Sequence, residues 1–256
     1  MWVALARKNR LLCEEARRTL YHSVDYKGDE YRGAPSSVFL NNPHLATYLI
    51  SCTIRCDHES PAPLDHPACS ILRPGPVLAS MTNLKELFIK VGEDYPPDML
   101  ESCPFKLYSF SWYHEIEGAD FANLASFLDE QDELRHLQAD WTYHPHGTGS
   151  SKPAVLLPSV CPKLEQLNGN HGIIEMVLPH RKLRTLVWDT LWGDPRTSFK
   201  HLAKEFSHLE AFSCYESPNT MKPPLSEYTP YFQNLKFCHL YLVVRSLPSH
   251  NPGLRD

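Results

Sequence analysis

The chain is poor in glycine, in long apolar runs and in excess positive charge, and each shortage argues against a class of function. Its 256 residues include 11 Gly against 22 Pro, so few loops can wrap backbone amides around a phosphate, and nucleotide-dependent enzymes are disfavoured. No stretch approaches the roughly 18 apolar residues of a membrane span. The formal net charge of -5 argues against a nucleic-acid partner. The composition is that of a globular protein of one or two domains.

The sequence also lacks the short motifs of common enzymes. It contains no G-x-S-x-G, H-E-x-x-H, Walker or G-x-G-x-x-G sequence. His144 and His146 have no Cys or carboxylate at metal-ligand spacing beside them, and the carboxylates between Asp129 and Glu133 are expected in a solvated turn. We therefore predict a protein that is not an enzyme, with no catalytic residues and no cofactor.

Eight cysteines occur in a chain whose first apolar residues are interrupted by Arg7, Lys8 and Arg10, unlike a secretory leader. We expect reduced thiols in an intracellular protein, cytoplasmic or nuclear. One group of cysteines and histidines has the ligand types of zinc but no common zinc spacing: Cys52, Cys56, His58, His66 and Cys69. No metal site is predicted, and a metal-binding enzyme that uses this Cys52–Cys69 cluster is kept as the less favoured alternative.

A pattern of apolar-x-x-apolar-x-apolar recurs along the chain. Clear copies begin at Leu84, Leu107, Leu134, Leu164, Leu183, Leu209 and Leu235. All of their patterned positions are apolar except Gly169, and a degenerate earlier copy is Leu45-x-x-Tyr48-x-Ile50. Because side chains alternate across a strand, the apolar positions are expected to face a core and the residues between them to face outward. A set of unrelated amphipathic strands is the alternative interpretation.

Short helix-like stretches precede several of these copies. Phe199, Leu202, Ala203 and Phe206, for example, have the spacing of one apolar helix face. Units of about 20–29 residues that combine a strand with a helix are typical of leucine-rich repeats. The predicted fold class is therefore α/β, a short irregular leucine-rich-repeat-like solenoid with a parallel sheet on the concave face and helices on the convex face.

The two ends of the chain differ from its middle. Apolar spacing between Trp2 and Tyr26 predicts a helix, and the last residues are polar and contain Pro and Gly. We divide the chain into an N-terminal helical cap at residues 1–35, the solenoid at residues 36–246 and a flexible tail at residues 247–256.

Three stretches resemble the F-box and leucine-rich-repeat-like proteins of mushroom-forming fungi. They are the run Ala16–Asp25 (ARRTLYHSVD), which is similar to the segment that follows the F-box in that family, and the phrases Ser80–Leu87 and Leu157–Leu167. The resemblance implies a substrate receptor, in which an F-box docks on a Skp-type adaptor of a cullin ubiquitin ligase and the repeats hold a target protein. The Leu-Pro-x-Glu phrase of an F-box is not found before Leu20, so the F-box itself is expected to be missing. A Skp-type adaptor is then a partner only if an F-box lies upstream.

The functional hypothesis is a non-catalytic protein–protein interaction module with an unknown target protein. Aromatic residues dominate the binding energy of interfaces, so outward aromatic and histidine positions are the candidate contacts: Phe88, Tyr113, His136, Tyr215, Phe237 and Tyr241. The alternative is a stand-alone repeat scaffold with no link to a ligase.

Overall fold

The computed structural model describes residues 10–27, 38–39, 41–55, 80–90, 100, 103–113, 118–140, 155–189, 199–216 and 227–242. Within these residues, nine strands form one parallel sheet in which the spatial order is the chain order. The strands are β1 (Ser23–Lys27), β2 (Ser51–Arg55), β3 (Glu86–Lys90), β4 (Ser109–Tyr113), β5 (His136–Asp140), β6 (Gln166–Gly169), β7 (Thr185–Asp189), β8 (Ala211–Glu216) and β9 (Phe237–Leu242). The predicted α/β class with a parallel sheet is confirmed at this level.

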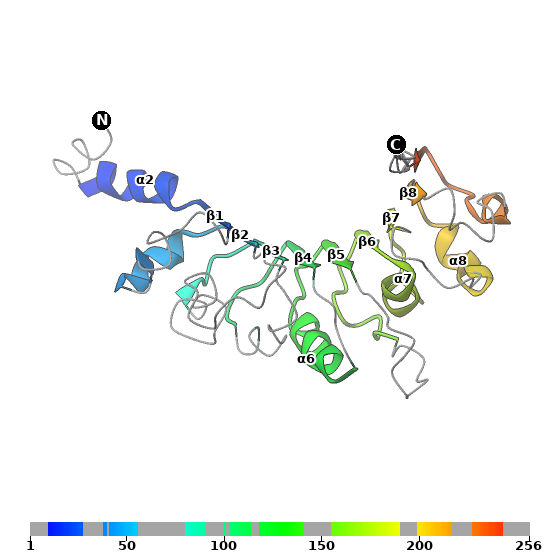
Figure 1. Cartoon of the computed structure of the whole chain (residues 1–256), viewed down its shortest axis with the longest axis horizontal. Coiled ribbons are helices and arrows are strands. Elements are labelled where there is room, and N and C mark those ends of the chain that lie inside the picture. The colour runs from blue at the N-terminus through cyan, green and yellow to red at the C-terminus, as the bar shows by residue number, and fades with distance from the viewer. Residues whose placement is uncertain are drawn as a thin grey trace, which may run out of the picture.

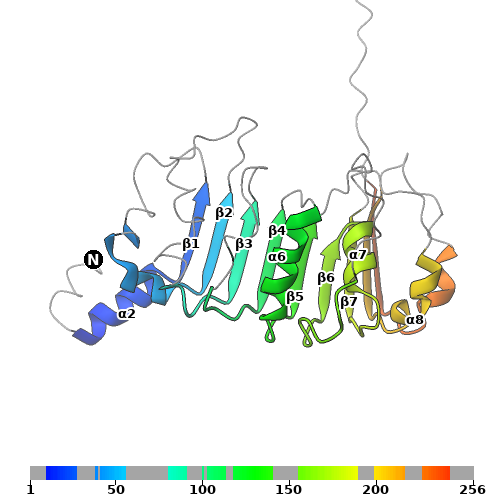
Figure 2. The same ribbon diagram turned by 90° about the horizontal axis from the view of Figure 1, so that it is seen from below.

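The sheet lines the inner side of a shallow arc; α6, α7 and α8 lie on its outer side, and α2 extends from its N-terminal end (Figure 1). Seen from that outer side, α6 and α7 lie in front of the strands, and α8 lies beside the C-terminal ones (Figure 2). The helical elements are α2 (Arg10–Leu20), η1 (Pro43–Tyr48), α6 (Gly118–Asp129), α7 (His171–Val177), η3 (Phe199–Leu202), α8 (Ala203–Phe206) and η5 (Thr229–Tyr231). No helix in the described ranges is both long and apolar enough to cross a membrane. We call the sheet surface that points away from the helices the open face.

Alternation of side chains fixes which residues enter the core. In β3, Leu87 and Ile89 are buried while their neighbours are half-buried or exposed. Equivalent residues of adjacent strands lie in register, and one row of the core runs through six of them: Leu87, Phe110, Leu137, Leu167, Leu186 and Phe212. Each fully buried side chain of this size contributes about 1.5–3 kcal/mol to folding. The recurring apolar pattern therefore forms a continuous core beneath the sheet.

Each strand also begins in the same way. The amides of Lys85 and Glu86 both donate to the carbonyl of Ile50, at 2.8 and 3.0 Å. Corresponding pairs of amides at the starts of β2 and of β4 to β9 donate to one carbonyl of the preceding unit. Successive units are therefore related by nearly the same displacement, which keeps equivalent side chains in rows.

The N-terminal part contains the expected helix and one unexpected strand. The helical spacing that ends at Leu20 lies in α2 (Arg10–Leu20), and Ser23–Lys27, placed in the helical cap by the sequence, pairs with β2 as the first strand of the sheet. One expectation was wrong. The copy at Leu45, Tyr48 and Ile50 forms the 3-10 helix η1 and the bend after it instead of a strand.

The correct phase of this second unit lies four residues later. Leu49, Cys52 and Ile54 follow the same apolar-x-x-apolar-x-apolar pattern, and all three are buried. Pro43 begins η1, where a proline is tolerated because the first helical amides have no intrahelical acceptor. The pattern in the sequence was therefore real but was read in the wrong register.

Gly169 departs from the apolar pattern because a helix packs closely against its strand. A Cβ atom added there would lie 2.7 Å from the Ala139 carbonyl oxygen and 2.8 Å from Cγ2 of Ile173. Asn170 caps α7 immediately after the strand, and its Oδ1 accepts a hydrogen bond of 3.3 Å from the Ile173 amide. The small residue lets the chain turn from strand to helix without a loop.

The last strand does not follow the burial pattern of the others. Leu235 is half-buried, and Cys238 and Leu240 are exposed, although the pattern predicted all three to face the core. β9 pairs only with β8 among the described strands, so its apolar side lacks the neighbouring unit that covers each earlier strand.

Candidate functional site

The open face consists of three rows of side-chain positions, one for each outward residue of a strand. The row at the strand starts includes Ser51, Glu86, Ser109, His136, Gln166 and Thr185. The middle row includes Asp25, Thr53, Phe88, Ser111, Gln138 and Asn168. The row at the strand ends includes Lys27, Arg55, Lys90, Tyr113 and Asp140. Most of these positions hold uncharged polar residues, so the few aromatic and charged residues are the distinctive features of the surface.

Four side chains from β2 to β5 form a connected group, which we call the aromatic cluster. The Arg55 guanidinium lies over the Phe88 ring, 5.2 Å from its centroid. The Phe88 and Tyr113 rings are 5.1 Å apart and tilted by 39°. Nε2 of Gln138 donates a hydrogen bond to the Tyr113 hydroxyl oxygen. The cluster thus holds two rings and a cation in fixed positions across four neighbouring strands.

Ser111 supports the aromatic cluster from within the middle row. Its hydroxyl donates to Oε1 of Gln138 at 3.5 Å, so the Gln138 amide is bonded through both its oxygen and its nitrogen. An amide held at both ends has one orientation, and it fixes the Tyr113 hydroxyl in turn. Side chains held by such contacts lose less entropy on binding than free side chains do.

A second aromatic group lies beside the cluster, at the start of β5. The Tyr108 and His136 rings meet edge to face, with centroids 4.9 Å apart. The Arg135 guanidinium lies 5.5 Å from the Tyr108 ring and forms an ion pair of 3.2 Å with Glu165. This arginine therefore has a carboxylate partner.

The predicted contact residues therefore fall into two groups. Phe88, Tyr113 and His136 lie half-buried on neighbouring strands β3 to β5. Phe237 and Tyr241 lie on β9 with exposed fractions of 64% and 45%. Tyr215 is in register with Tyr241, but its side chain lies outside the described residues. All six are on outward positions of the sheet. Phe88 and Tyr113 contact each other, whereas His136 contacts Tyr108.

Arg55 and Gln138 were missed as contact residues by the sequence analysis. Arg55 was overlooked because the second unit was read in the wrong register. In the correct phase, Arg55 follows Ile54 as Lys90 follows Ile89 and Tyr113 follows Trp112, so the sequence does contain the signal. Gln138 lies between Leu137 and Ala139 of the copy that begins at Leu134, so the pattern predicts that it faces outward, and nothing in its sequence context distinguishes it from other outward polar residues.

Charged residues just before the strands form ion pairs along one edge of the sheet. Glu210 contacts Lys236 at 3.1 Å and Arg184 at 3.4 Å. The hydrogen bonds from Lys236 and then from Arg184 lower the pKa of the Glu210 carboxyl. Lys163 lies 2.5 Å from Glu133 and lowers the pKa of that carboxyl in the same way. Each of these two carboxylates is therefore held by at least one cation from a neighbouring unit.

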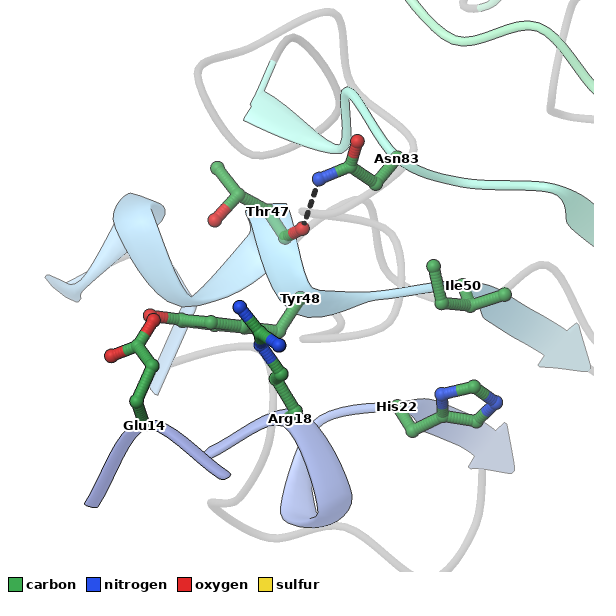
Figure 3. A pocket seen from close by; sticks show the side chains of 7 residues that line it. All are labelled: Glu14, Arg18, His22, Thr47, Tyr48, Ile50 and Asn83. Carbon is green, nitrogen blue, oxygen red and sulfur yellow. Dashed lines mark hydrogen bonds between the residues drawn. The ribbon is translucent and has the colours of Figure 1, made fainter. Parts of the chain in front are cut away.

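A separate pocket of about 400 Å³ lies between α2, η1 and the turn before β3 (Figure 3). Its lining residues are Glu14, Arg18, His22, Thr47, Tyr48, Ile50 and Asn83. The Tyr48 hydroxyl donates to Glu14 at 2.5 Å, and this bond raises the pKa of the phenol. Asn83 Nδ2 donates to the Thr47 carbonyl oxygen at 2.7 Å. The first bond connects α2 to η1, and the second connects η1 to the turn before β3. The pocket is therefore the space left where these three elements meet.

The structure bears on only part of the cysteine and histidine group. Cys52 lies in the core, where burial raises the pKa of its thiol to about 12, so it is protonated and a poor zinc ligand at neutral pH. Cys56, His58, His66 and Cys69 lie outside the described residues, as do His144, His146 and the predicted tail at residues 247–256. Among the residues that are described, no three His, Cys, Asp or Glu side chains are grouped so that they could hold a metal ion.

One buried histidine, His171, has a role in packing the fold. His171 stacks on Phe199 with ring centroids 4.4 Å apart, and its Nε2 lies 3.1 Å from the Glu175 carboxylate. Burial lowers the pKa of this imidazole, although Glu175 acts in the opposite direction. His171 therefore fastens α7 to the next unit on the outer side of the sheet, away from the open face.

Comparison with known proteins adds no relative to this picture. Neither a protein-family model nor a curated protein matches the chain.

Proposed function

We propose that the chain is a non-catalytic protein-binding module whose open face holds a partner protein. The observation that carries this proposal is the aromatic cluster, in which Arg55, Phe88, Tyr113 and Gln138 are fixed on the inner side of the arc. Arginine and tyrosine are enriched among the residues that dominate interface energies. A prearranged group of this kind supports binding to a surface rather than to a small molecule, because it sits on an open sheet.

We also propose that the sheet and its helices form a leucine-rich-repeat-like solenoid. The in-register rows and the repeated amide pairs support this, since stacked units bury apolar faces that no single unit can bury alone. Solenoids use their concave surfaces for extended protein contacts. The proposed fold and the proposed function therefore agree on which surface is used.

Photo-crosslinking from both faces tests the binding function. A crosslinking amino acid is placed on the open face at Thr53 or Asn168, and on the outer side at Ser126 or Lys204 as controls. The proposal predicts that both open-face positions capture the same protein and that neither control captures it. A Phe88→Ala change is expected to abolish that capture while the protein stays folded. Capture from the outer positions, or capture that survives Phe88→Ala, would contradict the proposal.

The resemblance to F-box and leucine-rich-repeat-like proteins supports a more specific role, in which the bound protein is a target for ubiquitination. This role is proposed on the resemblance alone, and a scaffold without a ligase is the competing role. Co-purification of the longest in-frame product of the gene with a Skp-type adaptor and a cullin distinguishes them. Stoichiometric adaptor supports a ligase receptor, and its absence leaves the binding module without a ligase.

A further inference from the structure

β9 is the last strand of the sheet, and among the described strands it pairs only with β8. The Phe237 amide donates to the Glu210 carbonyl oxygen at 3.1 Å and therefore points toward the preceding unit. Backbone groups of successive residues in a strand point to opposite sides, so the amides and carbonyls of Cys238 and Leu240 point to the other edge of β9. An edge of this kind is a template for a further strand.

The sequence of β9 lacks the features that commonly keep another strand away from an edge. Charged side chains and proline give this protection in natural sheets. β9 has the sequence FCHLYL and contains neither, whereas β1, the strand at the other end of the sheet, contains Asp25 and Lys27. The side chains from Phe237 to Tyr241 are all exposed. The free edge of β9 is therefore uncharged and apolar on both faces, which favours pairing with another strand.

The order of residues in β9 is symmetric about His239. An apolar residue lies one position away on each side, Cys238 and Leu240, and an aromatic residue lies two positions away, Phe237 and Tyr241. In an antiparallel pair, directly opposite side chains share one face of the sheet. A two-fold axis through His239 places Phe237 opposite Tyr241 of a second copy on the open face, and Cys238 opposite Leu240 of that copy on the core side. Each residue thus meets a chemically similar one.

We propose that the free edge of β9 pairs antiparallel with β9 of a second copy of the chain, about a two-fold axis at His239. Cys238 of one copy and Leu240 of the other exchange backbone hydrogen bonds, and the aromatic pairs lie on the open face. A two-fold dimer uses the same surface of both copies, which the symmetry of β9 fits. One pair of strands forms a small interface, so the dimer is weak. The proposal goes beyond the proposed function, because it uses other strands than the aromatic cluster.

Sedimentation equilibrium of the full chain from about 1 to 200 µM tests the proposal, because this range covers the weak dimers formed by small interfaces. The parent chain is expected to show a monomer–dimer equilibrium. His239→Lys and His239→Glu each place two like charges directly opposite each other at the axis, and each is expected to weaken the dimer about tenfold or more. An equimolar mixture of the two variants places opposite charges there, so it is expected to restore dimers that contain one copy of each variant.

His44→Lys and His44→Glu are the matched controls, because His44 is an exposed histidine in η1, before the second strand of the sheet. They are expected to leave the dimer unchanged, and urea unfolding checks that every variant is folded. A parent chain that stays monomeric, assemblies larger than dimers, no gain on mixing the His239 variants, or an equal loss in the His44 variants would each overturn the proposal. Crosslinking from Thr53 and Asn168 still decides the proposed function separately, since it does not depend on β9.

Discussion

Gly169 and Gly172 form a matched pair that tests how the strand and helix of one unit pack. The repeat pattern alone predicts that an apolar residue at position 169 would add to the core. The structure predicts the opposite, because a Cβ at Gly169 lies 2.7 Å from the backbone oxygen of Ala139. At Gly172, in α7, the nearest atom to an added Cβ outside the helix backbone is Asn170 Oδ1 at 3.7 Å, an ordinary van der Waals distance.

The two Gly→Ala substitutions are therefore expected to change stability in opposite directions. Gly169→Ala should lower the free energy of unfolding by about 1–3 kcal/mol, since the backbone of the preceding strand, β5, must move to admit the methyl group. Gly172→Ala should raise it by about 0.5–1 kcal/mol, because alanine is the better helix former. Urea unfolding measures both through the transition midpoint at constant slope. A Gly169→Ala protein as stable as the parent would refute the close packing of α7 on β6.

Three further predictions concern buried groups. Arg181 is buried and donates to three backbone carbonyl oxygens, so Arg181→Met should lower the free energy of unfolding by about 1–3 kcal/mol for each carbonyl left unsatisfied, as urea unfolding would measure. Burial raises the pKa of the Cys52 and Cys161 thiols to about 12, so in the native protein iodoacetamide should modify the exposed Cys238 and spare these two, as read by mass spectrometry. The pKa of His171 is lowered in the folded state, so its contribution to stability is present above about pH 6.5 and is lost as the pH falls. His171→Phe should reduce that loss in thermal unfolding measured across the same pH range.

The seven later strands could be predicted from the sequence because two signals coincide in them. An apolar triplet such as Leu134, Leu137 and Ala139 marks the core positions, and polar residues between them mark the outward ones. The register of the sheet then follows from aligning the triplets. The prediction succeeds because each inner unit packs between the preceding and the following unit. Local sequence and tertiary packing therefore favour the same arrangement.

The first two strands and part of the candidate site were missed for physical reasons. In the first unit, the apolar pair Tyr21 and Val24 follows directly on the charged residues at the end of α2. The change from the helical spacing of apolar residues to the alternation of a strand is therefore hard to recognise in the sequence. At the second unit, Leu45 and Tyr48 satisfy the pattern by chance in a 3-10 helix. Arg55 was lost with that register, although it is the cation of the aromatic cluster. The contact between Arg55 and Phe88 depends on pairing between β2 and β3, whose paired residues are 35 apart in the sequence, and no single segment encodes that pairing.

The central claim is that consecutive units stack so that equivalent core residues are neighbours. Methyl NOEs between leucine side chains in the native protein test this most directly. The register places Leu167 between Leu137 and Leu186, at a strand spacing of about 4.8 Å. The account predicts strong NOEs from Leu167 to both of the others and none between Leu137 and Leu186, which are two strands apart. An NOE pattern in which Leu167 contacts neither leucine would contradict the stacking and the open face that depends on it.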